Sequence, residues 1–223
     1  MNAPRILLLD TSSSRCQVAM LADALHCRYG SSERQSAQNI LPLIAELVTD
    51  TATPLSDLAA IAVMAGPGSF TGLRIGVGVA QALSMANSTP GIRLSNLAAL
   101  AFAASLRCDA DVFWTAMPAR EGEFYFAVYA RDQQAGVILL GKEQVAVPSA
   151  LDWVKPSGSH VLVGEWWLGD SSLREALGEG ADFIEATPTL ETMAILTQKL
   201  FAQGQTCESA MLRPNYVKEQ LEY

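Results

Sequence analysis

The stretch "MAGPGSFTGLRIGVGVAQAL", residues 64–83, continues an apolar run that begins with "AIAVMA" at 60–65. An uninterrupted apolar run of this length indicates a strand that is buried on both faces. The glycines and the proline that follow mark a turn, and the small and apolar residues from about Thr71 to Asn87 predict a helix. A buried strand that passes through a glycine turn into a helix is typical of an α/β protein.

The glycine turn matches neither of the common phosphate-binding fingerprints. The segment "GPGSFTG" lacks the Gly-Lys-Ser/Thr ending of a P-loop, and its G-x-G-x-x-x-G spacing is not that of a dinucleotide fold. Two alternatives remain open: either N–H groups at the helix N-terminus bind an anion or a nucleotide phosphate, or Ser69 or Thr71 caps the helix. The candidate anion-binding residues are Asp10, Thr11, Gly68, Ser69, Thr71 and Gly72.

Asp10 enters this set because it ends an apolar strand and is followed by "TSSS". An actin-like fold uses an aspartate in such a place to approach phosphate and magnesium. The alternative is that Asp10 and Thr11 only cap and turn a hairpin, as Asp and Thr commonly do.

Small residues recur along the helix behind the turn in two series, Gly72, Gly76 and Ala80, and Gly78, Ala82 and Ala86. Each glycine inside a helix costs about 1 kcal/mol relative to alanine, so close backbone contact is expected to offset that loss. The spacing therefore predicts a packing face against another helix, which belongs either to this chain or to a partner.

Strand and helix patterns alternate on both sides of this stretch, as an α/β layer architecture requires. A subdomain boundary is predicted near 107–110, because aromatic strand patterns begin there. The predicted domains are 1–108, joined by a helix at 188–204, then 109–187, and a tail at 205–223. The predicted strands are 5–10, 16–21, 24–29, 60–65, 92–96, 111–117, 123–130, 136–147 and 160–164, and the predicted helices are 36–50, 71–87, 96–106, 148–154, 171–177 and 187–204.

Composition excludes several function classes. The 223 residues carry 15 Lys and Arg against 23 Asp and Glu, a formal net charge of −8, which disfavours strong direct binding of nucleic acid. Four cysteines without a CxxC pair and only two histidines, His26 and His160, make a zinc site, a disulfide framework or a histidine-dependent nucleophile improbable. The apolar segments are too short for a signal peptide or a membrane span, so a soluble cytoplasmic protein is expected.

These motifs resemble the bacterial TsaB (YeaZ) family over most of the chain. The resemblance rests on "RILLLDTSSSRCQVAML", "GPGSFTGLRIGVGVAQAL", "ERQSAQNILPLI", "AREGEFYFAVY" and "RPNYVK". It implies an actin-like (ASKHA, ribonuclease H-like) α/β fold of two related subdomains. The chain departs from the family in two places: Ser36-Ala37 stands where His-Thr or His-Ser is common, and Pro118 stands where an acidic residue is common.

The resemblance also implies a function, which is support of the complex that makes N6-threonylcarbamoyladenosine at position 37 of tRNAs that read ANN codons. In that family the paralogue TsaD carries the transfer chemistry with ATP and a metal ion, and TsaE is a further ATPase subunit. The expected role is a non-catalytic subunit that binds no cofactor of its own, pairs with TsaD or with a second copy of itself, and meets tRNA only through the complex. The histidine metal ligands expected of TsaD have no counterpart here.

The glycine-lined helix 71–87 and the apolar helix 38–50 are the expected contact with TsaD or with a second copy. The alternative is that the same side chains build the core of the chain itself. A different function, an actin-like ATPase or small-molecule kinase, would use Asp10, Thr11 and the glycine turn on ATP and magnesium. The predicted interface residues are Leu43, Ile44, Leu47, Leu73, Gly76, Val77 and Ala80.

Overall fold

The computed structural model describes residues 4–31, 35–120, 122–147, 157–168 and 182–217. The chain forms two compact units, the first of residues 1–96 and 190–215 and the second of residues 97–189 and 216–223. The division between them therefore lies at 96/97, whereas the sequence pattern predicts a boundary near 108. The segment 205–215, predicted as part of a tail, lies in the first unit.

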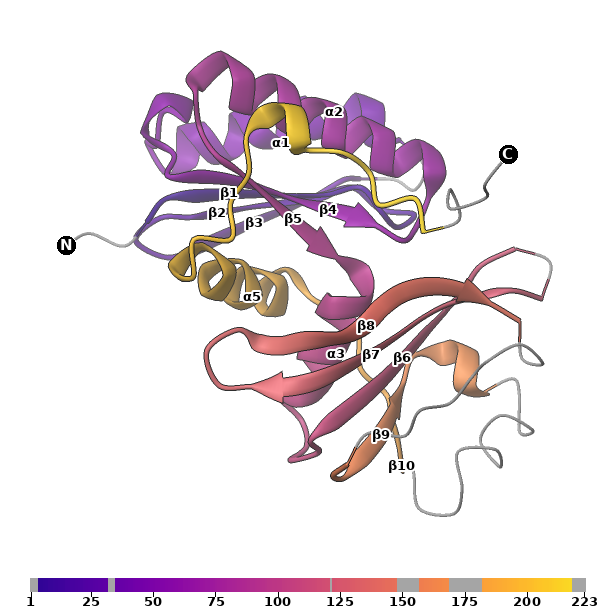
Figure 1. Cartoon of the computed structure of the whole chain (residues 1–223). Coiled ribbons are helices and arrows are strands. Elements are labelled where there is room, and N and C mark those ends of the chain that lie inside the picture. The colour runs from indigo at the N-terminus through magenta and orange to yellow at the C-terminus, as the bar shows by residue number, and fades with distance from the viewer. Residues whose placement is uncertain (1–3, 32–34, 121, 148–156, 169–181, 218–223) are drawn as a thin grey trace. The chain divides into compact units, whose positions relative to one another are not determined.

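The first unit is built on a mixed five-stranded sheet (Figure 1). The strand order is β3-β2-β1-β4-β5, in which β2 pairs antiparallel with both β1 and β3, and β4 pairs parallel with both β1 and β5. All five residues of β1 and all seven of β4 are buried, as their uninterrupted apolar sequences predict. The strands are β1 (Ile6–Asp10), β2 (Gln17–Leu21), β3 (Leu25–Tyr29), β4 (Ala60–Gly66) and β5 (Gly91–Ser95).

Helices cover both faces of this sheet. Figure 1 shows α1 (Ser36–Asp50) and α2 (Phe70–Asn87) on one face and α5 (Leu190–Ala202) on the other. Leu7 and Leu9 of β1 face α1 and α2, where they join one hydrophobic core cluster with the buried side of both helices. Leu212, just after the 3₁₀ turn Ser209–Met211, also enters that core and is 1% exposed.

The second unit repeats this topology. Its sheet has the order β8-β7-β6-β9-β10, with an antiparallel meander β6-β7-β8 and with β9 and β10 added in parallel, so it matches the first sheet strand for strand. Two mixed sheets of the same order confirm the predicted α/β fold of two related subdomains. The elements are α3 (Asn96–Ser105), β6 (Val112–Pro118), β7 (Phe124–Asp132), β8 (Gly136–Ala146), β9 (His160–Val163), a 3₁₀ helix (Glu165–Leu168) and β10 (Asp182–Ile184).

Aromatic side chains make the core of the second unit. Trp114 and Trp167 are fully buried, and the indole N–H of Trp167 donates to the Trp114 carbonyl oxygen at 3.0 Å. Phe124 stacks on Trp166 with ring centroids 3.9 Å apart. This core explains the aromatic strand pattern that begins after residue 110.

Several predicted element bounds differ from the structure. Pro42, expected near the first turn of its helix, is the seventh residue of α1 and is exposed, so only one main-chain hydrogen bond is lost there. The last helix begins at Leu190 rather than at Pro188 and ends before Gly204, whose φ of +70° suits a helix stop. The sequence pattern does not predict strand β10 or the 3₁₀ turns Leu55–Asp57, Glu165–Leu168 and Ser209–Met211. The helices predicted at 148–154 and 171–177 lie outside the described residues.

Within the described ranges, no helix has the length and apolar character needed to cross a membrane.

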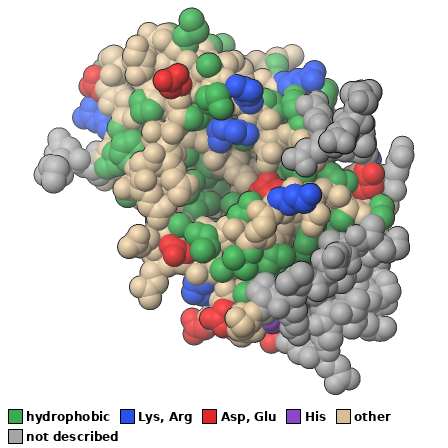
Figure 2. Space-filling view, viewed as in Figure 1, with side chains coloured by type: hydrophobic (Ala, Val, Ile, Leu, Met, Phe, Trp, Pro, Cys, Tyr) green, Lys and Arg blue, Asp and Glu red, His purple; other side chains and the backbone are tan. Residues whose placement is uncertain are grey.

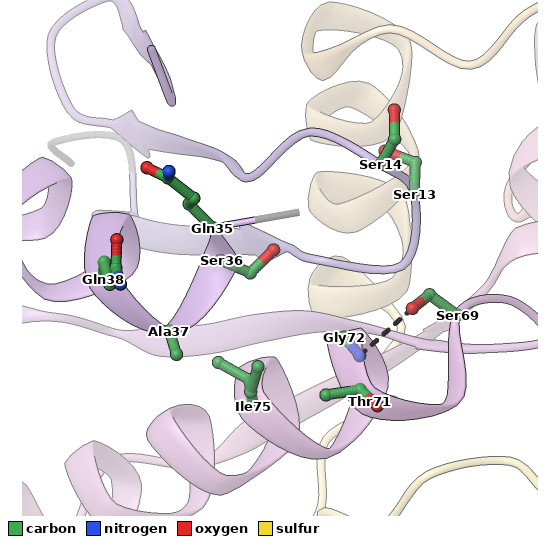
Figure 3. Close-up of a pocket in the computed structure, with 10 residues that line it drawn as sticks. All are labelled: Ser13, Ser14, Gln35, Ser36, Ala37, Gln38, Ser69, Thr71, Gly72 and Ile75. Carbon is green, nitrogen blue, oxygen red and sulfur yellow. Dashed lines mark hydrogen bonds between the residues drawn. The ribbon is translucent and has the colours of Figure 1, made fainter. Parts of the chain in front are cut away.

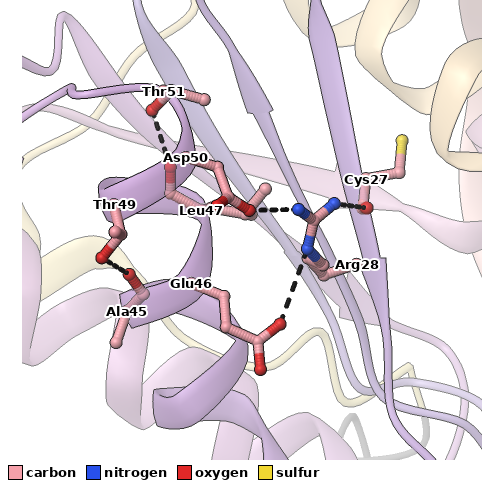
Figure 4. Close-up of polar contacts among 8 residues, drawn as sticks. All are labelled: Cys27, Arg28, Ala45, Glu46, Leu47, Thr49, Asp50 and Thr51. Carbon is pink, nitrogen blue, oxygen red and sulfur yellow. Dashed lines mark hydrogen bonds and ion pairs between the residues drawn. The ribbon is translucent and has the colours of Figure 1, made fainter.

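Arg28 of β3 clamps that edge strand to α1 (Figure 4). Its guanidinium lies 3.5 Å from a carboxylate oxygen of Glu46, contacts the carboxylate of Asp50, and donates to the Cys27 carbonyl oxygen at 2.8 Å. The paired side chains are 37%, 57% and 44% exposed, so water and salt screen the charges.

Replacing Arg28 by alanine is expected to lower the free energy of unfolding by about 1 kcal/mol or less, because exposed ion pairs contribute little. The difference from wild type should shrink in about 1 M salt, where the Debye length is about 3 Å. Urea unfolding at low and high salt measures it. A difference that is unchanged at high salt would show that Arg28 acts through packing rather than charge.

Candidate functional site

The glycine turn caps its own helix. Ser69 precedes α2, and its hydroxyl oxygen accepts a hydrogen bond from the N–H of Gly72 at 3.2 Å. The Leu73 N–H donates to the Ser69 carbonyl oxygen at 2.8 Å. The sequence leaves Ser69 and Thr71 as candidates for the helix cap, and Ser69 is the residue that caps α2. Its hydroxyl satisfies the Gly72 N–H, one of the groups that an anion would otherwise bind.

The glycines of the turn allow it to approach the β1–β2 hairpin closely. A Cβ on Gly72 would lie 1.9 Å from the Thr11 carbonyl oxygen, and one on Gly76 would lie 2.3 Å from the Thr11 hydroxyl oxygen. A Cβ on Gly68 would lie 2.7 Å from the Ser12 carbonyl oxygen. The series Gly72, Gly76 therefore packs on a hairpin of the same chain, and not on another helix as the spacing alone predicts.

Asp10 is buried in a hydrogen-bond network. One carboxylate oxygen accepts from the N–H and the hydroxyl of Ser12 at 2.8 and 2.6 Å, and the other accepts from the Gln17 amide at 2.6 Å. Asn96 in turn donates from its amide to the Ser12 hydroxyl oxygen at 2.8 Å, and Thr11 donates to the Gly72 carbonyl oxygen at 2.7 Å.

These contacts do not fit a magnesium–nucleotide site at Asp10. Both oxygens of its carboxylate already accept from side chains or backbone of the chain, and its exposed fraction is 4%. In the part of the chain that the structure describes, no three His, Cys, Asp or Glu residues are grouped so that they could hold a metal ion. Asp10 thus holds the hairpin turn through Ser12, as its residue type allows, and a phosphate site that includes Asp10 and Thr11 stays a prediction.

The seven residues predicted as a partner interface lie in the core of the first unit. All are buried; Leu47 and Ala80 are 0% exposed, and Leu43, the most exposed of the apolar six, is 8% exposed. Five of them share one core cluster with side chains of β1, β2 and β4, and this burial fixes both helices to the sheet: Leu43, Ile44, Leu47, Val77 and Ala80. The interface prediction is therefore corrected for Leu43, Ile44, Leu47, Leu73, Gly76, Val77 and Ala80, which present no surface to a partner.

The opposite side of the same two helices is exposed and carries large and small apolar residues among polar ones such as Gln38, Glu46 and Arg74. Met85 of α2 is 76% exposed and Leu41 of α1 is 57% exposed. Surface helices normally place charged or polar residues on this side. Figure 2 shows hydrophobic side chains on the surface over α1 and α2, with charged ones scattered among them. We call this surface the outer helix face and define it by the exposed residues Ala37, Leu41, Ala45, Gly78, Ala82 and Met85.

Sequence reasoning found the outer helix face only in part. Gly78 and Ala82 belong to the second series of small residues on the helix, so the pattern was visible in the sequence. Because α2 carries small residues on two sides, periodicity could not tell which side meets the sheet.

A cavity of about 610 Å³ opens where the hairpin, the start of α1 and the start of α2 come together (Figure 3). Of the residues proposed from the sequence as an anion site, Ser69, Thr71 and Gly72 line it, whereas Asp10, Thr11 and Gly68 do not. The lining residues are Ser13, Ser14, Gln35, Ser36, Ala37, Gln38, Ser69, Thr71, Gly72 and Ile75.

Cys16 is part of the hydrophobic core of the first unit. Burial, and to a lesser extent the charge of Asp10, raises the pKa of its thiol from an ordinary value near 9.0 to about 11. The unfolded chain therefore loses this proton at a lower pH than the folded chain. The stability contributed by the protonated thiol is fully present below about pH 9 and is lost as the pH rises toward 11.

The variant Cys16→Ala should be less stable than wild type at about pH 8, because it leaves a cavity, and the difference should narrow by about pH 10.5 as wild type loses the contribution of the thiol. Urea unfolding at the two pH values measures the change. Cys27 and Cys207, whose thiol pKa values are also raised by burial, titrate in both proteins and cancel in the comparison. A difference that is constant or grows with pH would contradict the burial of this thiol.

Comparisons with known proteins agree with one another. Residues 23–166 match the family TsaD, tRNA N6-adenosine threonylcarbamoyltransferase. The protein named tRNA threonylcarbamoyladenosine biosynthesis protein TsaB from Escherichia coli (strain K12) is 33% identical, over 96% of this chain and 94% of its own length. The protein of the same name from Haemophilus influenzae is 31% identical, over 97% of this chain and 94% of its own length. Among solved structures, YeaZ from Pseudomonas aeruginosa is 30% identical with a TM-score of 0.80, over 96% of this chain and 99% of its own.

Proposed function

The chain belongs to the TsaB (YeaZ) family of tRNA threonylcarbamoyladenosine biosynthesis proteins, and on this premise we propose that it is a non-catalytic subunit that binds the catalytic paralogue TsaD. In this role it acts in the cytoplasm, in the complex that forms N6-threonylcarbamoyladenosine at position 37 of tRNAs that read ANN codons. It supports the transferase and takes no part in bond making.

The outer helix face carries this proposal. Two adjacent helices expose the small residues Gly78 and Ala82, where another helix could approach closely, and the large apolar residues Leu41 and Met85, which could pack against it. The charged side chain on α2 there, Arg74, stacks on Phe70 at 3.8 Å from the ring centroid. Apolar surface that is grouped in this way typically marks a protein contact.

A helix pair of the same fold suits this face best. The paralogue TsaD shares the family match, so its own α1 and α2 are the natural partners in a contact of four helices. When TsaD is absent, a second copy of this chain is the proposed occupant, which gives a homodimer. TsaE then joins as a further subunit of the complex.

The chemistry is assigned to the partner. The carboxylate of Asp10 is fully hydrogen-bonded, which supports placing ATP and the metal ion on TsaD rather than on this chain. The net charge of −8 supports contact with tRNA through the complex and not through this subunit alone.

Omitting the subunit from a reconstituted reaction tests the role. A mixture of TsaD, TsaE, tRNA, ATP and a threonylcarbamoyl donor is expected to modify tRNA at a low rate without this chain and at a much higher rate with it. Mass spectrometry of the digested tRNA nucleosides measures the product. Equal modification with and without the chain would overturn the proposal.

A further inference from the structure

The cavity at the start of α1 and α2 is lined by neutral residues from three segments of the first unit (Figure 3). The hairpin contributes Ser13 and Ser14, the start of α1 contributes Ser36 and Ala37, and the turn before α2 contributes Ser69. None of the lining residues in the described part of the chain is an aspartate or a glutamate. Such a lining disfavours a metal cation and leaves hydroxyl and N–H donors facing the space.

Ser36 has an unused hydroxyl in this cavity. The residue is 7% exposed, and within the described ranges its hydroxyl has no hydrogen-bond partner. Figure 3 shows the oxygen turned toward the hairpin segment that carries Ser13. The Ser36 oxygen is not one of the fully buried atoms without a partner, so it keeps contact with the space of the cavity and is free to donate to a group bound there.

The backbone of α1 also offers unpaired donors at this point. Gln35, the residue before the helix, makes no side-chain cap, and the N–H groups of Ser36 and Ala37 have no partner among the residues that the structure describes. Helix α2, in contrast, is capped by Ser69. The two helices are 15 and 18 residues long, and neither has an acidic residue in its first turn to offset the positive end of its dipole.

We propose that this cavity binds a phosphate-class oxyanion, either free phosphate or the terminal phosphate of a larger molecule. The Ser36 hydroxyl and the N–H groups of Ser36 and Ala37 donate to its oxygens, and the converging helix dipoles favour its charge. The buried carboxylate in the same hairpin, Asp10, is occupied by its own hydrogen bonds and does not line the cavity. The cavity volume of about 610 Å³ leaves room beyond one phosphate. The site does not depend on the role proposed above.

Titration of the full-length chain with inorganic phosphate tests the site, with chloride at matched ionic strength as the reference. In a two-dimensional amide NMR spectrum, the signals of Ser36 and Ala37 are expected to shift in a saturable manner with phosphate and not with chloride. Ser36→Ala should weaken phosphate binding about tenfold, because one hydrogen bond to a charged group is lost. The absence of a saturable shift in the wild-type chain would overturn the proposal.

A pair of matched variants separates the site from general charge effects. Ala37→Asp places a carboxylate at the mouth of the cavity, where it should compete with phosphate and weaken its binding at least about tenfold. Ala45→Asp adds the same charge to an exposed position two turns further along α1 and should leave phosphate binding unchanged. Equal effects of both variants, or none from Ala37→Asp, would contradict a site at this place.

Competition distinguishes the two sources of the phosphate group. The competitor is ATP without magnesium. If ATP binds more tightly than phosphate and phosphate displaces it, the ligand group is a terminal phosphate. If ATP and phosphate bind with equal affinity, the ligand is free phosphate. Binding of ATP that phosphate does not displace and that Ser36→Ala does not weaken would place the nucleotide elsewhere and count against the proposal.

Discussion

Replacing Gly72 by alanine is expected to lower the free energy of unfolding by about 3 kcal/mol, the upper end of the usual cost of forcing extra atoms into a packed interior. The added Cβ would lie 1.9 Å from the Thr11 carbonyl oxygen, which is backbone and cannot turn aside. The hairpin or the start of α2 must therefore move. Movement there also disturbs the bond from the Thr11 hydroxyl to the Gly72 carbonyl oxygen. Urea unfolding of the purified variant measures the loss.

Gly78→Ala is the matched control on the same helix. No atom lies within 4 Å of the position of its added Cβ, and the residue is exposed. The substitution should raise the free energy of unfolding by about 1 kcal/mol, since alanine is the better helix former. Two Gly→Ala changes six residues apart thus have opposite predicted signs. Equal effects at the two positions would contradict the close approach of the glycine turn to the hairpin.

Replacing Ala82 by arginine is expected to weaken association with TsaD at least about 100-fold, because a long charged side chain would enter the centre of a close helix contact. Ala82 is exposed in the isolated chain, so the variant should keep the stability of wild type. Sedimentation velocity of the chain mixed with TsaD measures the association. Unchanged unfolding by urea confirms that the variant is folded.

Ala202→Arg is the control for this change. Ala202 is likewise an exposed alanine on a helix of the first unit, but it ends α5 on the other face of the sheet (Figure 1). Its replacement should leave association with TsaD unchanged. If Ala202→Arg weakens association as strongly as Ala82→Arg, the outer helix face is not the contact.

A further variant, Gly76→Leu, would not test the interface, although the sequence pattern suggests it. Its added side chain would meet the Thr11 hydroxyl inside the chain, so it would report on folding.

The fold could be predicted because its strands carry local signals. The buried central strands β1 and β4 are uninterrupted apolar runs, and the turns between elements are marked by glycine, proline and hydroxyl residues. The three-residue strand β10 was missed, since Asp182–Ile184 is too short to show a period. The division at 96/97 has no signal in composition, because α3 is as apolar as the elements before it.

The site was harder to predict because its contacts join residues far apart in the sequence. Asn96 reaches Ser12 across 84 residues, and Gln17 occupies a carboxylate oxygen of Asp10 from the next strand. No local pattern reveals that Asp10 is already satisfied. The direction in which α2 turns its small residues is likewise set by tertiary packing, and only the structure separates Gly76, which is buried, from Gly78, which is exposed.

Hydrogen–deuterium exchange of the chain, alone and mixed with TsaD, tests the central claim most directly. The claim is that the outer helix face binds the catalytic paralogue. It predicts slower exchange in peptides that cover residues 37–46 and 74–86 when TsaD is present, with little change in α5. Protection that is absent from both helices, or that is confined to other parts of the chain, would contradict it.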